Sequence, residues 1–233
     1  MSHQDAFERA LAAIAGDVAA CRACPRLVAW REQIARERRR AYRDEAYWGR
    51  GVPGFGDPAA RVVLLGLAPG AHGANRTGRM FTGDASGDFL YAALHRAGLA
   101  SHGISRSRDD GLALRGAFIT NACRCAPPGN RPAPDELARC AAFLARELAT
   151  LRDVRVIVAL GAIAWDAALA HLSLARGMVP RPRPRFGHGA ELRLAAAPVL
   201  LGSYHPSRQN TQTGRLTAAM LDAVLARAVA LAR

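Results

Sequence analysis

Short apolar runs alternate with amphipathic stretches along most of this chain. Four runs rich in Val, Ile, Leu and Ala end in glycine, proline or polar residues, which is the pattern of buried β-strands. They cover residues 61–69, 116–121, 154–160 and 198–204. Around them, apolar residues recur at helical spacing. The helices that this spacing predicts cover residues 4–20, 26–40, 86–98, 134–150 and 161–171, and a last one begins near residue 214.

Strands that alternate with helices form a parallel sheet covered on both faces. The 233 residues suffice for one large domain. We therefore expect an α/β fold and a single domain over residues 1–233. In sheets of this kind the ligand crevice lies beyond the carboxyl ends of the strands. Three polar segments lie at those ends, after Leu67, from Asn121 and after Tyr204, so we expect them to form one site.

The first of these segments, "GLAPGAHGANRTGRMFTGDASGDF" at residues 66–89, is rich in glycine, which lets a backbone approach a ligand closely. It lacks both the Lys-Ser/Thr ending of a phosphate-binding loop and the dinucleotide fingerprint, which excludes a nucleoside-triphosphate loop. Asp84 and Asp88 stand at the start of the next predicted helix, where either one suits an N-cap as well as a catalytic acid. We interpret His72 and Arg79 as structural side chains.

The last polar segment reads "HPSRQNTQTGRLT" over residues 205–217 and follows a predicted core strand. Loops that a rigid scaffold presents at a strand end are where binding and catalytic groups concentrate. A single histidine beside a strand end is nevertheless more often a structural residue than a catalyst. From the residues alone, both interpretations of His205 stay open.

Five cysteines suggest a metal centre. Cys21 and Cys24 form a Cys-x-x-Cys pair, and Cys125 and Cys140 lie far away in the sequence. One pair and two single cysteines suit an iron–sulphur cluster better than the two tight pairs of a zinc ribbon. The alternative is that Cys125 and Cys140 are small buried apolar residues. Cys123 falls beside a predicted strand, where a core position is expected.

The chain is strongly basic, with 32 Lys+Arg against 19 Asp+Glu and a formal net charge of +13. Arginine supplies all 32 of these basic residues, and its planar guanidinium binds phosphate with two hydrogen bonds. A GC-rich genome also enriches arginine and alanine, but it does not explain the shortage of acidic residues. Charge therefore favours nucleic acid over a membrane or a protein as the partner.

The amino-terminal residues lack the basic region and apolar core of a signal peptide, and no apolar run approaches the roughly 20 residues of a membrane span. We therefore expect a soluble, cytoplasmic protein with no membrane partner. In that reducing compartment cysteines more often bind metal than form disulfides.

Three long motifs resemble the uracil-DNA glycosylase superfamily, and most closely its iron–sulphur type-b branch, also called family 5. They are "GLAPGAHGANRTGRMFTGDASG", "ITNACRCAPPGNRPAPDELARC" and "SYHPSRQNTQTGRLT". With the first two cysteines and "LVAWRE", the likeness runs over most of the chain. The resemblance implies a three-layer α/β/α fold with a central four-stranded parallel sheet. It also implies a monofunctional DNA glycosylase that hydrolyses the N-glycosidic bond of a damaged base and leaves an abasic site in base excision repair.

The resemblance further implies catalytic roles for Asp84, His205 and Asn121. The acid would position water or stabilise the cationic sugar, the imidazole would donate a hydrogen bond to the departing base, and the amide would bind the edge of a pyrimidine. The implied substrate pocket comprises Gly66, Ala68, Gly70, Ala71, Phe81 and Asn121, with Phe81 as the stacking surface.

Two further sets of residues follow from the same resemblance. A structural [4Fe-4S] cluster would be held by Cys21, Cys24, Cys125 and Cys140. The loop that enters the duplex would bind DNA through Ser203, Ser207, Arg208, Gln209 and Asn210. The implied partner is DNA that contains deaminated bases, and we expect the protein to be a monomer.

The first motif departs from that of the strict uracil enzymes at two positions. Those enzymes carry an acid or amide where this chain has Ala68, and a tyrosine where it has Gly70. Loss of the acid shifts water activation to Asp84, and loss of the tyrosine leaves room beside the C5 position of a pyrimidine. We therefore expect a broad specificity that covers uracil and hypoxanthine and extends to xanthine, ethenocytosine and hydroxymethyluracil.

Two alternatives keep the fold without this activity. One is a catalytically silent iron–sulphur protein that binds DNA, which the absence of an acid at Ala68 favours. The other is an iron–sulphur redox sensor with DNA affinity, which would need a cluster that cycles at an accessible potential. The basic insertion ending in histidine that marks the crosslinking branch of the superfamily is not found in this sequence, so turnover is expected rather than covalent capture.

Overall fold

The computed structural model describes residues 3–177, 181–195 and 197–233. Its sheet has six strands in the order β1-β3-β2-β4-β6-β5. They are β1 (Phe55–Gly56), β2 (Val62–Gly66), β3 (Ala117–Asn121), β4 (Val156–Leu160), β5 (Glu191–Leu192) and β6 (Val199–Ser203). The four central strands are parallel, and each edge of the sheet adds a two-residue antiparallel strand. The expected four-stranded parallel core is confirmed, and the two edge strands are additional to it.

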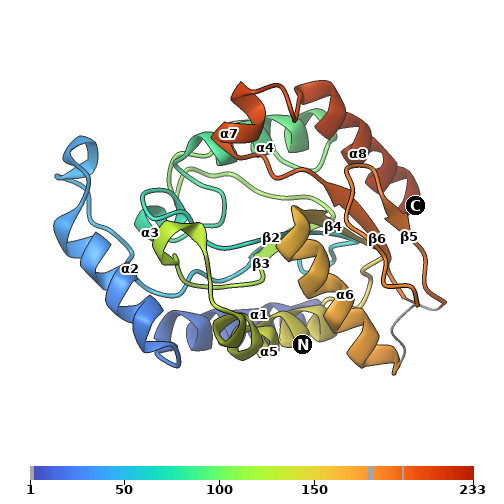
Figure 1. Ribbon diagram of the computed structural model, residues 1–233, viewed down its shortest axis with the longest axis horizontal. Helices are drawn as coiled ribbons and strands as arrows, with labels where there is room; N and C mark the ends of the chain where they lie inside the picture. Colours follow the sequence, from blue (N-terminus) through green and yellow to red (C-terminus); the bar gives the residue numbers. More distant parts are fainter. Residues whose placement is uncertain (1–2, 178–180, 196) are drawn as a thin grey trace.

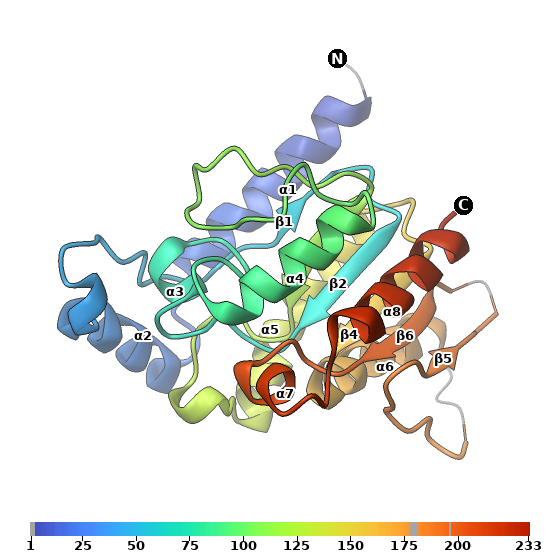
Figure 2. The same ribbon diagram turned by 90° about the horizontal axis from the view of Figure 1, so that it is seen from above.

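Helices cover both faces of the sheet, which gives the expected three-layer α/β/α arrangement (Figure 1, Figure 2). One layer contains α1 (His3–Ala20), α5 (Pro134–Thr150) and α6 (Ala162–Arg176), and the other contains α4 (Ala85–Arg96) and α8 (Ala218–Leu231). Beyond the carboxyl ends of the strands lie α2 (Pro25–Glu37), α3 (Ala74–Thr77), α7 (Arg208–Gln212) and the 3-10 turns η1 (Arg40–Tyr42) and η2 (Pro128–Asn130). Among the helices of the described residues, none combines the length and the apolar character needed to cross a bilayer.

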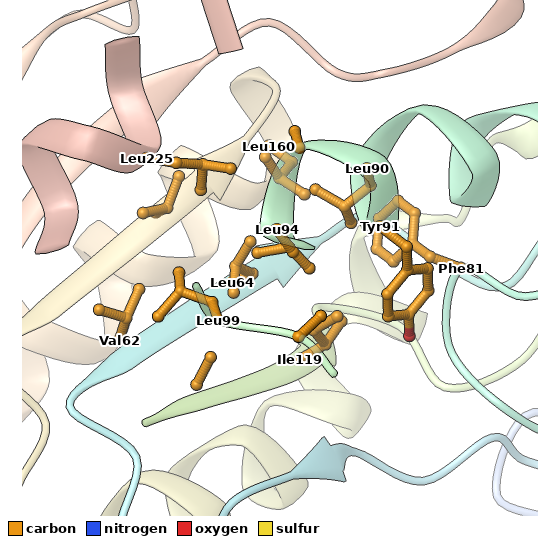
Figure 3. Packing of buried hydrophobic residues seen from close by; sticks show 14 of the residues in the cluster. Val62, Leu64, Phe81, Leu90, Tyr91, Leu94, Leu99, Ile119, Leu160 and Leu225 are labelled. Carbon is orange, nitrogen blue, oxygen red and sulfur yellow. The ribbon is translucent and has the colours of Figure 1, made fainter. Parts of the chain in front are cut away.

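Alternate side chains of the central strands enter the two helical layers. Val62 and Leu64 of β2 pack among the leucines of α4 and α8 (Figure 3). Val63 and Leu65 pack on the other face, in the cluster that surrounds the fully buried Trp165 of α6. Because β2, β3 and β4 are buried along their whole length, their sequences read as continuous apolar runs.

The ends of some elements differ from the sequence prediction. Helix α2 ends at Glu37 rather than at residue 40, because Arg38 adopts a left-handed φ of 53°. The predicted loop 205–217 contains the short helix α7, which Ser207 caps. The final helix begins directly after Thr217 rather than near residue 214, because the Thr217 hydroxyl provides its N-cap. Local capping thus sets the boundaries that hydrophobic spacing left undefined.

Candidate active site and cysteine centre

The carboxyl ends of the parallel strands bring the three polar segments together. Gly66 and Asn121 end β2 and β3 as directly paired neighbours. His205 follows β6, and its ring centroid lies 5.8 Å from that of Phe81 in the glycine-rich loop, with 32° between the ring planes. A Cβ atom added to Gly66 would lie 2.8 Å from Cζ of Phe81. The structure therefore places the glycine-rich loop, the Asn121 amide and the His205 imidazole in one site.

Asn121 presents an amide whose hydrogen-bonding capacity is largely unused. Its side chain is almost completely buried, with 1% exposed. The Nδ2 group donates to the thioether sulphur of Met80 at 2.9 Å, which is a weak acceptor, and Oδ1 has no partner among the described residues. An unpaired buried polar atom costs about 1–3 kcal/mol. A ligand that offers one donor and one acceptor side by side, as a pyrimidine edge does, would remove that cost.

The space beside the Asn121 amide depends on Gly66. A Cβ atom at Gly66 would lie only 2.3 Å from Asn121 Oδ1, so a larger residue would displace the amide or the Phe81 ring. Phe81 itself has a left-handed φ of 50°, which is rare for a bulky residue. Such strain costs on the order of 1–3 kcal/mol and is concentrated at functional sites. The strained backbone is a second mark of a ligand site at this position.

Burial keeps the His205 imidazole neutral. It lowers the pKa of His205 to about 4, so at pH 7 the ring carries a single N–H donor. The backbone carbonyl of His205 accepts a hydrogen bond from Nδ2 of Asn210 at 2.9 Å, which fixes the turn between β6 and α7. The ring is therefore an uncharged hydrogen-bond donor that lies against Phe81.

The free energy of unfolding should reflect this neutral histidine. The unfolded chain binds a proton at the ordinary histidine pKa of 6.5, whereas the folded chain binds it only near pH 4. Stability should therefore fall as the pH is lowered through this window, by on the order of 3 kcal/mol from His205 alone. Denaturant unfolding of the wild type and of His205→Asn at several pH values checks this. If the two proteins lost stability equally on acidification, the assignment of a buried neutral His205 would be wrong.

Asp84 caps α4 and also faces the glycine-rich turn. Its Oδ1 accepts a hydrogen bond from the Gly87 amide at 3.0 Å, so the N-cap interpretation is confirmed. The Oδ2 atom lies beside Gly73 and Gly70, where added Cβ atoms would stand 1.9 and 2.9 Å from it. Burial raises the pKa of Asp84, and the amide hydrogen bonds at the start of α4 oppose that rise. Only one oxygen is used for capping, which leaves the other for a ligand or water.

Arg76, which the sequence prediction missed, holds the glycine-rich loop around Asp84. Its guanidinium is 8% exposed and pairs with Glu45. Its Nε donates to the carbonyl of His72 and its Nη2 to the carbonyl of Gly83, both at 2.8 Å. These two carbonyls directly precede Gly73 and Asp84, so one side chain fixes both sides of the turn. Two arginines, Arg76 and Arg79, within a glycine-rich loop were the available sequence signal.

His72 and Arg79 make the structural contacts expected of them. His72 Nδ1 lies 3.0 Å from the hydroxyl of Tyr47. The Arg79 guanidinium forms two hydrogen bonds of 2.7 Å with the carboxylate of Asp110. It also donates to Ser105 at 2.9 Å. These contacts clamp the glycine-rich loop to the segment that follows α4.

Ala68 and Ala71 are the two alanines of the predicted substrate pocket. Ala68 packs against the cysteine cluster. The carbonyl of Ala71 accepts a long hydrogen bond from Nδ2 of Asn75 at 3.4 Å. Their predicted substrate contacts stay predictions, whereas Gly66, Phe81 and Asn121 surround one position.

The predicted DNA-binding residues are partly buried and partly exposed. Ser203 ends β6 with its side chain fully buried, and its hydroxyl donates to the next carbonyl at 3.0 Å. The structure thus corrects the expectation that Ser203 binds phosphate, because its hydroxyl is enclosed. Ser207 caps α7 by accepting from the Asn210 amide at 3.3 Å. Arg208 and Gln209 are exposed in the first turn of α7, where they are free to contact DNA.

The cysteines gather at one place beside α2. Cys24, Cys125 and Cys140 join the fully buried Cys123 in one apolar cluster. Cys21 is half-buried at the end of α1 and is close enough to Cys125 to influence its thiol electrostatically. All five cysteines are free thiols. Segments more than 100 residues apart in sequence therefore supply sulphur atoms to a common centre.

Hydrogen bonds link this centre to its surroundings. Arg31, a buried residue of α2, donates from Nη1 to the Cys125 sulphur at 2.8 Å. The neighbouring Cys123 thiol holds the pKa of Cys140 below its usual range, and burial raises the pKa of Cys125 to about 11. In the part of the chain that the structure describes, no three His, Cys, Asp or Glu side chains are arranged to hold a single metal ion. The centre is rich in sulphur atoms, and in the described residues these atoms do not surround a single metal position.

Known proteins share this arrangement of motifs. The model of the uracil DNA glycosylase superfamily matches residues 53–228, which include the glycine-rich loop and both strand-end motifs. A type-5 uracil-DNA glycosylase from Thermus thermophilus is 58% identical over 213 residues, covering 91% of this chain and 94% of that protein.

Proteins of the same name from Mycobacterium bovis and Pyrobaculum aerophilum are 55% and 48% identical. These alignments cover 92% and 90% of this chain and 79% and 88% of the two relatives. They extend the likeness beyond the superfamily match, to nearly the full length of the chain. The chain therefore belongs to the uracil-DNA glycosylase superfamily.

Proposed function

We propose that this protein is a monofunctional uracil-DNA glycosylase that extrudes damaged bases from DNA, hydrolyses their N-glycosidic bond and leaves an abasic site. The observation that carries the proposal is the buried Asn121 amide, whose Oδ1 has no partner within the described residues and lies beside Gly66 and Phe81. The type-5 uracil-DNA glycosylases to which the chain is similar support the same chemistry.

Recognition begins with extrusion of the base. A base inside a duplex cannot be attacked, so it must rotate out of the stack into a pocket. Phe81 offers an aromatic face, and stacking of a base on such a face contributes about 1–3 kcal/mol. The Asn121 amide then pairs with the edge of the base, which supplies the partners that the free protein lacks. A base without a matching edge leaves the amide unpaired and binds more weakly.

His205 assists departure of the base. Hydrolysis breaks the bond between the sugar C1′ atom and the base nitrogen, and the electron pair leaves with the base. Negative charge therefore develops on a carbonyl oxygen of the base, to which the neutral imidazole donates a hydrogen bond. Loss of a donor of this kind costs on the order of 10²–10³ in rate.

Asp84 acts on the other side of the broken bond. The sugar becomes cationic as the base leaves, and a water oxygen then adds to C1′ and gives up a proton. The Oδ2 atom, which the capping hydrogen bond leaves unused, positions this water or balances the sugar charge. An ionised carboxylate is needed for either role, and Arg76 keeps it in place by fixing the carbonyl that precedes it.

The cysteine centre fits a [4Fe-4S] cluster held by Cys21, Cys24, Cys125 and Cys140. Ligands of such a cluster bind different irons and so stand farther apart than ligands of one ion, which agrees with a sulphur-rich centre that has no single-ion site in the described residues. When bound, the cluster would supply covalent links between the amino-terminal segment and the rest of the fold. The buried guanidinium of Arg31 would neutralise part of the thiolate charge.

We further propose a broad base specificity. Gly70 has no side chain where the strict uracil enzymes carry a tyrosine, and even a Cβ atom there would stand 2.9 Å from Oδ2 of Asp84, so no bulky group blocks the base at this position. The decisive experiment measures free base released from duplexes that carry uracil or hypoxanthine, with an undamaged thymine duplex as control. Release of both damaged bases supports the proposal, and release of uracil alone would restrict the enzyme to uracil. No release by folded, DNA-binding protein would favour the silent DNA-binding alternative or a redox sensor.

Gly73→Ala should slow base release by about a hundredfold, because a Cβ atom at Gly73 would stand 1.9 Å from Oδ2 of Asp84 and 2.7 Å from its Cγ. The carboxylate must move, and misplacement by about 1 Å is costly for catalysis. Single-turnover base release from a uracil duplex is the measurement. The matched control is Gly16→Ala, where an added Cβ meets nothing within 4 Å. Equal rates for both variants would show that the position of Asp84 is unimportant.

The proposed setting is repair of deaminated DNA by a monomer in the cytoplasm. The five cysteines form no disulfide in the described structure, which suits that reducing compartment. Size-exclusion chromatography with light scattering tests the monomer, and cell fractionation tests the location.

A further inference from the structure

We propose that residues 36–43 form a second DNA-binding surface, which contacts the phosphate backbone of the duplex outside the base pocket. This inference rests on the proposed function for its partner, DNA. The segment begins in the last turn of α2, continues beyond that helix, reads "RERRRAYR" and contains five arginines and one glutamate. All five arginines are exposed. We call this segment the arginine segment.

Three of its guanidinium groups are uncommitted. The guanidinium groups of Arg36, Arg39 and Arg40 form no hydrogen bond or ion pair within the described residues. Several exposed arginines elsewhere pair with acids from distant segments, as Arg96 does with Asp222 at 2.8 Å. Like charges crowded together without counter-charges repel one another, so their accumulation on one turn favours a polyanionic partner.

The arginine segment is fixed to the glycine-rich loop. The Arg76 guanidinium, which holds that loop, lies 3.9 Å from the ring centroid of Tyr42 and pairs with Glu45. The Tyr47 hydroxyl bridges the two segments, because it accepts from the Arg39 amide at 3.3 Å and lies 3.0 Å from His72. Figure 1 shows the segment projecting next to α3, at the carboxyl edge of the sheet. These contacts tie the arginine segment to the loop that surrounds the proposed base pocket.

A basic hollow extends the surface towards the cysteine centre. It measures about 530 Å³ and lies between α2 and the segment that carries Trp48. Its charged lining residues are Arg22, Arg31, Glu32, Arg36 and Arg50. The Arg22–Glu32 pair neutralises itself and Arg31 is buried against the Cys125 sulphur, so Arg36 and Arg50 leave an excess of positive charge in the hollow. The hollow is large enough to receive a phosphate group and part of its sugar.

The chemistry of the surface favours nucleic acid over a membrane. The chain has no lysine, so each basic group is a planar guanidinium suited to two hydrogen bonds with one phosphate. The large apolar side chains exposed in the described residues are Ile104, Ile163 and Leu174, which lie outside the arginine segment. A surface without apolar groups to insert binds a lipid headgroup layer weakly. The regularly spaced phosphates of DNA match the arginine segment better than a lipid surface does.

Salt dependence of DNA binding tests the inference. The test protein carries Arg36→Gln, Arg39→Gln and Arg40→Gln. The control carries the same loss of charge at Arg115→Gln, Arg155→Gln and Arg233→Gln, exposed residues at the opposite edge of the sheet. The dissociation constant for a duplex with an abasic-site analogue is measured between about 50 and 200 mM salt. Thermal unfolding confirms that each protein is folded.

The plot of log affinity against log salt should become less steep by about two to three in the test protein, with affinity near 0.1 M salt lower by on the order of a hundredfold. The control should keep the wild-type slope. An unchanged slope in the test protein, or an equal change in the control, would overturn the inference. Uracil release by the wild type is measured in parallel. Its absence would refute the proposed function, while the slope would still decide whether this surface binds DNA.

Discussion

Asp84→Asn should release damaged base roughly 10²–10⁴ times more slowly than the wild type, the loss expected when a positioned carboxylate is removed from a hydrolytic reaction. The amide has no negative charge to balance a cationic sugar and cannot accept a proton from water. It does retain a carbonyl oxygen for the hydrogen bond that Asp84 receives from Gly87 at 3.0 Å. The substitution therefore separates the chemical role of the side chain from its capping role.

Asp84→Ala provides the matched comparison. It also removes the cap of α4, which should lower the free energy of unfolding by about 1 kcal/mol relative to Asp84→Asn. Both variants should bind an abasic duplex as well as the wild type, because within the described residues the hydrogen bond of the Asp84 carboxylate goes to the Gly87 amide and not to an exposed basic residue. Single-turnover base release and denaturant unfolding measure the two effects. Wild-type release by Asp84→Asn would show that the residue is only a cap.

The pH dependence of base release gives an independent check. Burial raises the pKa of Asp84, so its reactive ionised form is lost on acidification at a higher pH than for an ordinary carboxyl group. The rate should therefore fall as the pH drops through that raised pKa. The residual rate of Asp84→Asn should not show this fall at acidic pH. His205 adds no further loss between pH 7 and pH 5, because its own pKa is about 4. If the rate of Asp84→Asn still fell at acidic pH, the fall would belong to the titration of another group.

The parallel sheet could be predicted because its signal is local. Strands buried on both faces must be apolar throughout, and Val62–Gly66 or Val156–Leu160 can therefore be read directly from composition. The edge strands β1 and β5 have only two residues each, and pairing with a neighbour alone defines them. Helix ends were also missed where a single backbone angle decided them, as at Arg38. Such features depend on tertiary contacts that no window of sequence contains.

The residue types of the site could be predicted from the sequence, but the contacts between those residues could not. The topology rule places Asn121 and His205 at one edge, and motif resemblance adds Asp84. Neither shows that Oδ1 of Asn121 is unpaired, that Phe81 is strained or that Arg76 spans the loop. These properties arise from packing between segments that are distant in sequence. They determine which atoms of the site are available to bind a ligand.

One buried ion pair connects the two functional centres. Arg124, between Cys123 and Cys125, forms hydrogen bonds of 2.9 and 2.7 Å with Glu147 of α5. The Thr120 hydroxyl, next to Asn121 in sequence, donates to the same carboxylate at 2.6 Å. Arg124 and Glu147 are 1% and 2% exposed, so neither charge has access to water. The pair therefore anchors the segment that carries both the base-reading amide and a cysteine of the centre.

Arg124→Met should lower the free energy of unfolding by about 3–5 kcal/mol, because it leaves the Glu147 carboxylate buried without its counter-charge. The double variant Arg124→Met/Glu147→Leu should recover much of this loss, since it removes the stranded charge and fills the space with apolar atoms. Arg146→Gln is the control. It breaks the exposed pair of Arg146 with Asp17 and should cost less than about 1 kcal/mol. Denaturant unfolding ranks the three proteins, and a double variant less stable than Arg124→Met would mean that hydrogen bonds to Glu147, rather than charge balance, hold this segment in place.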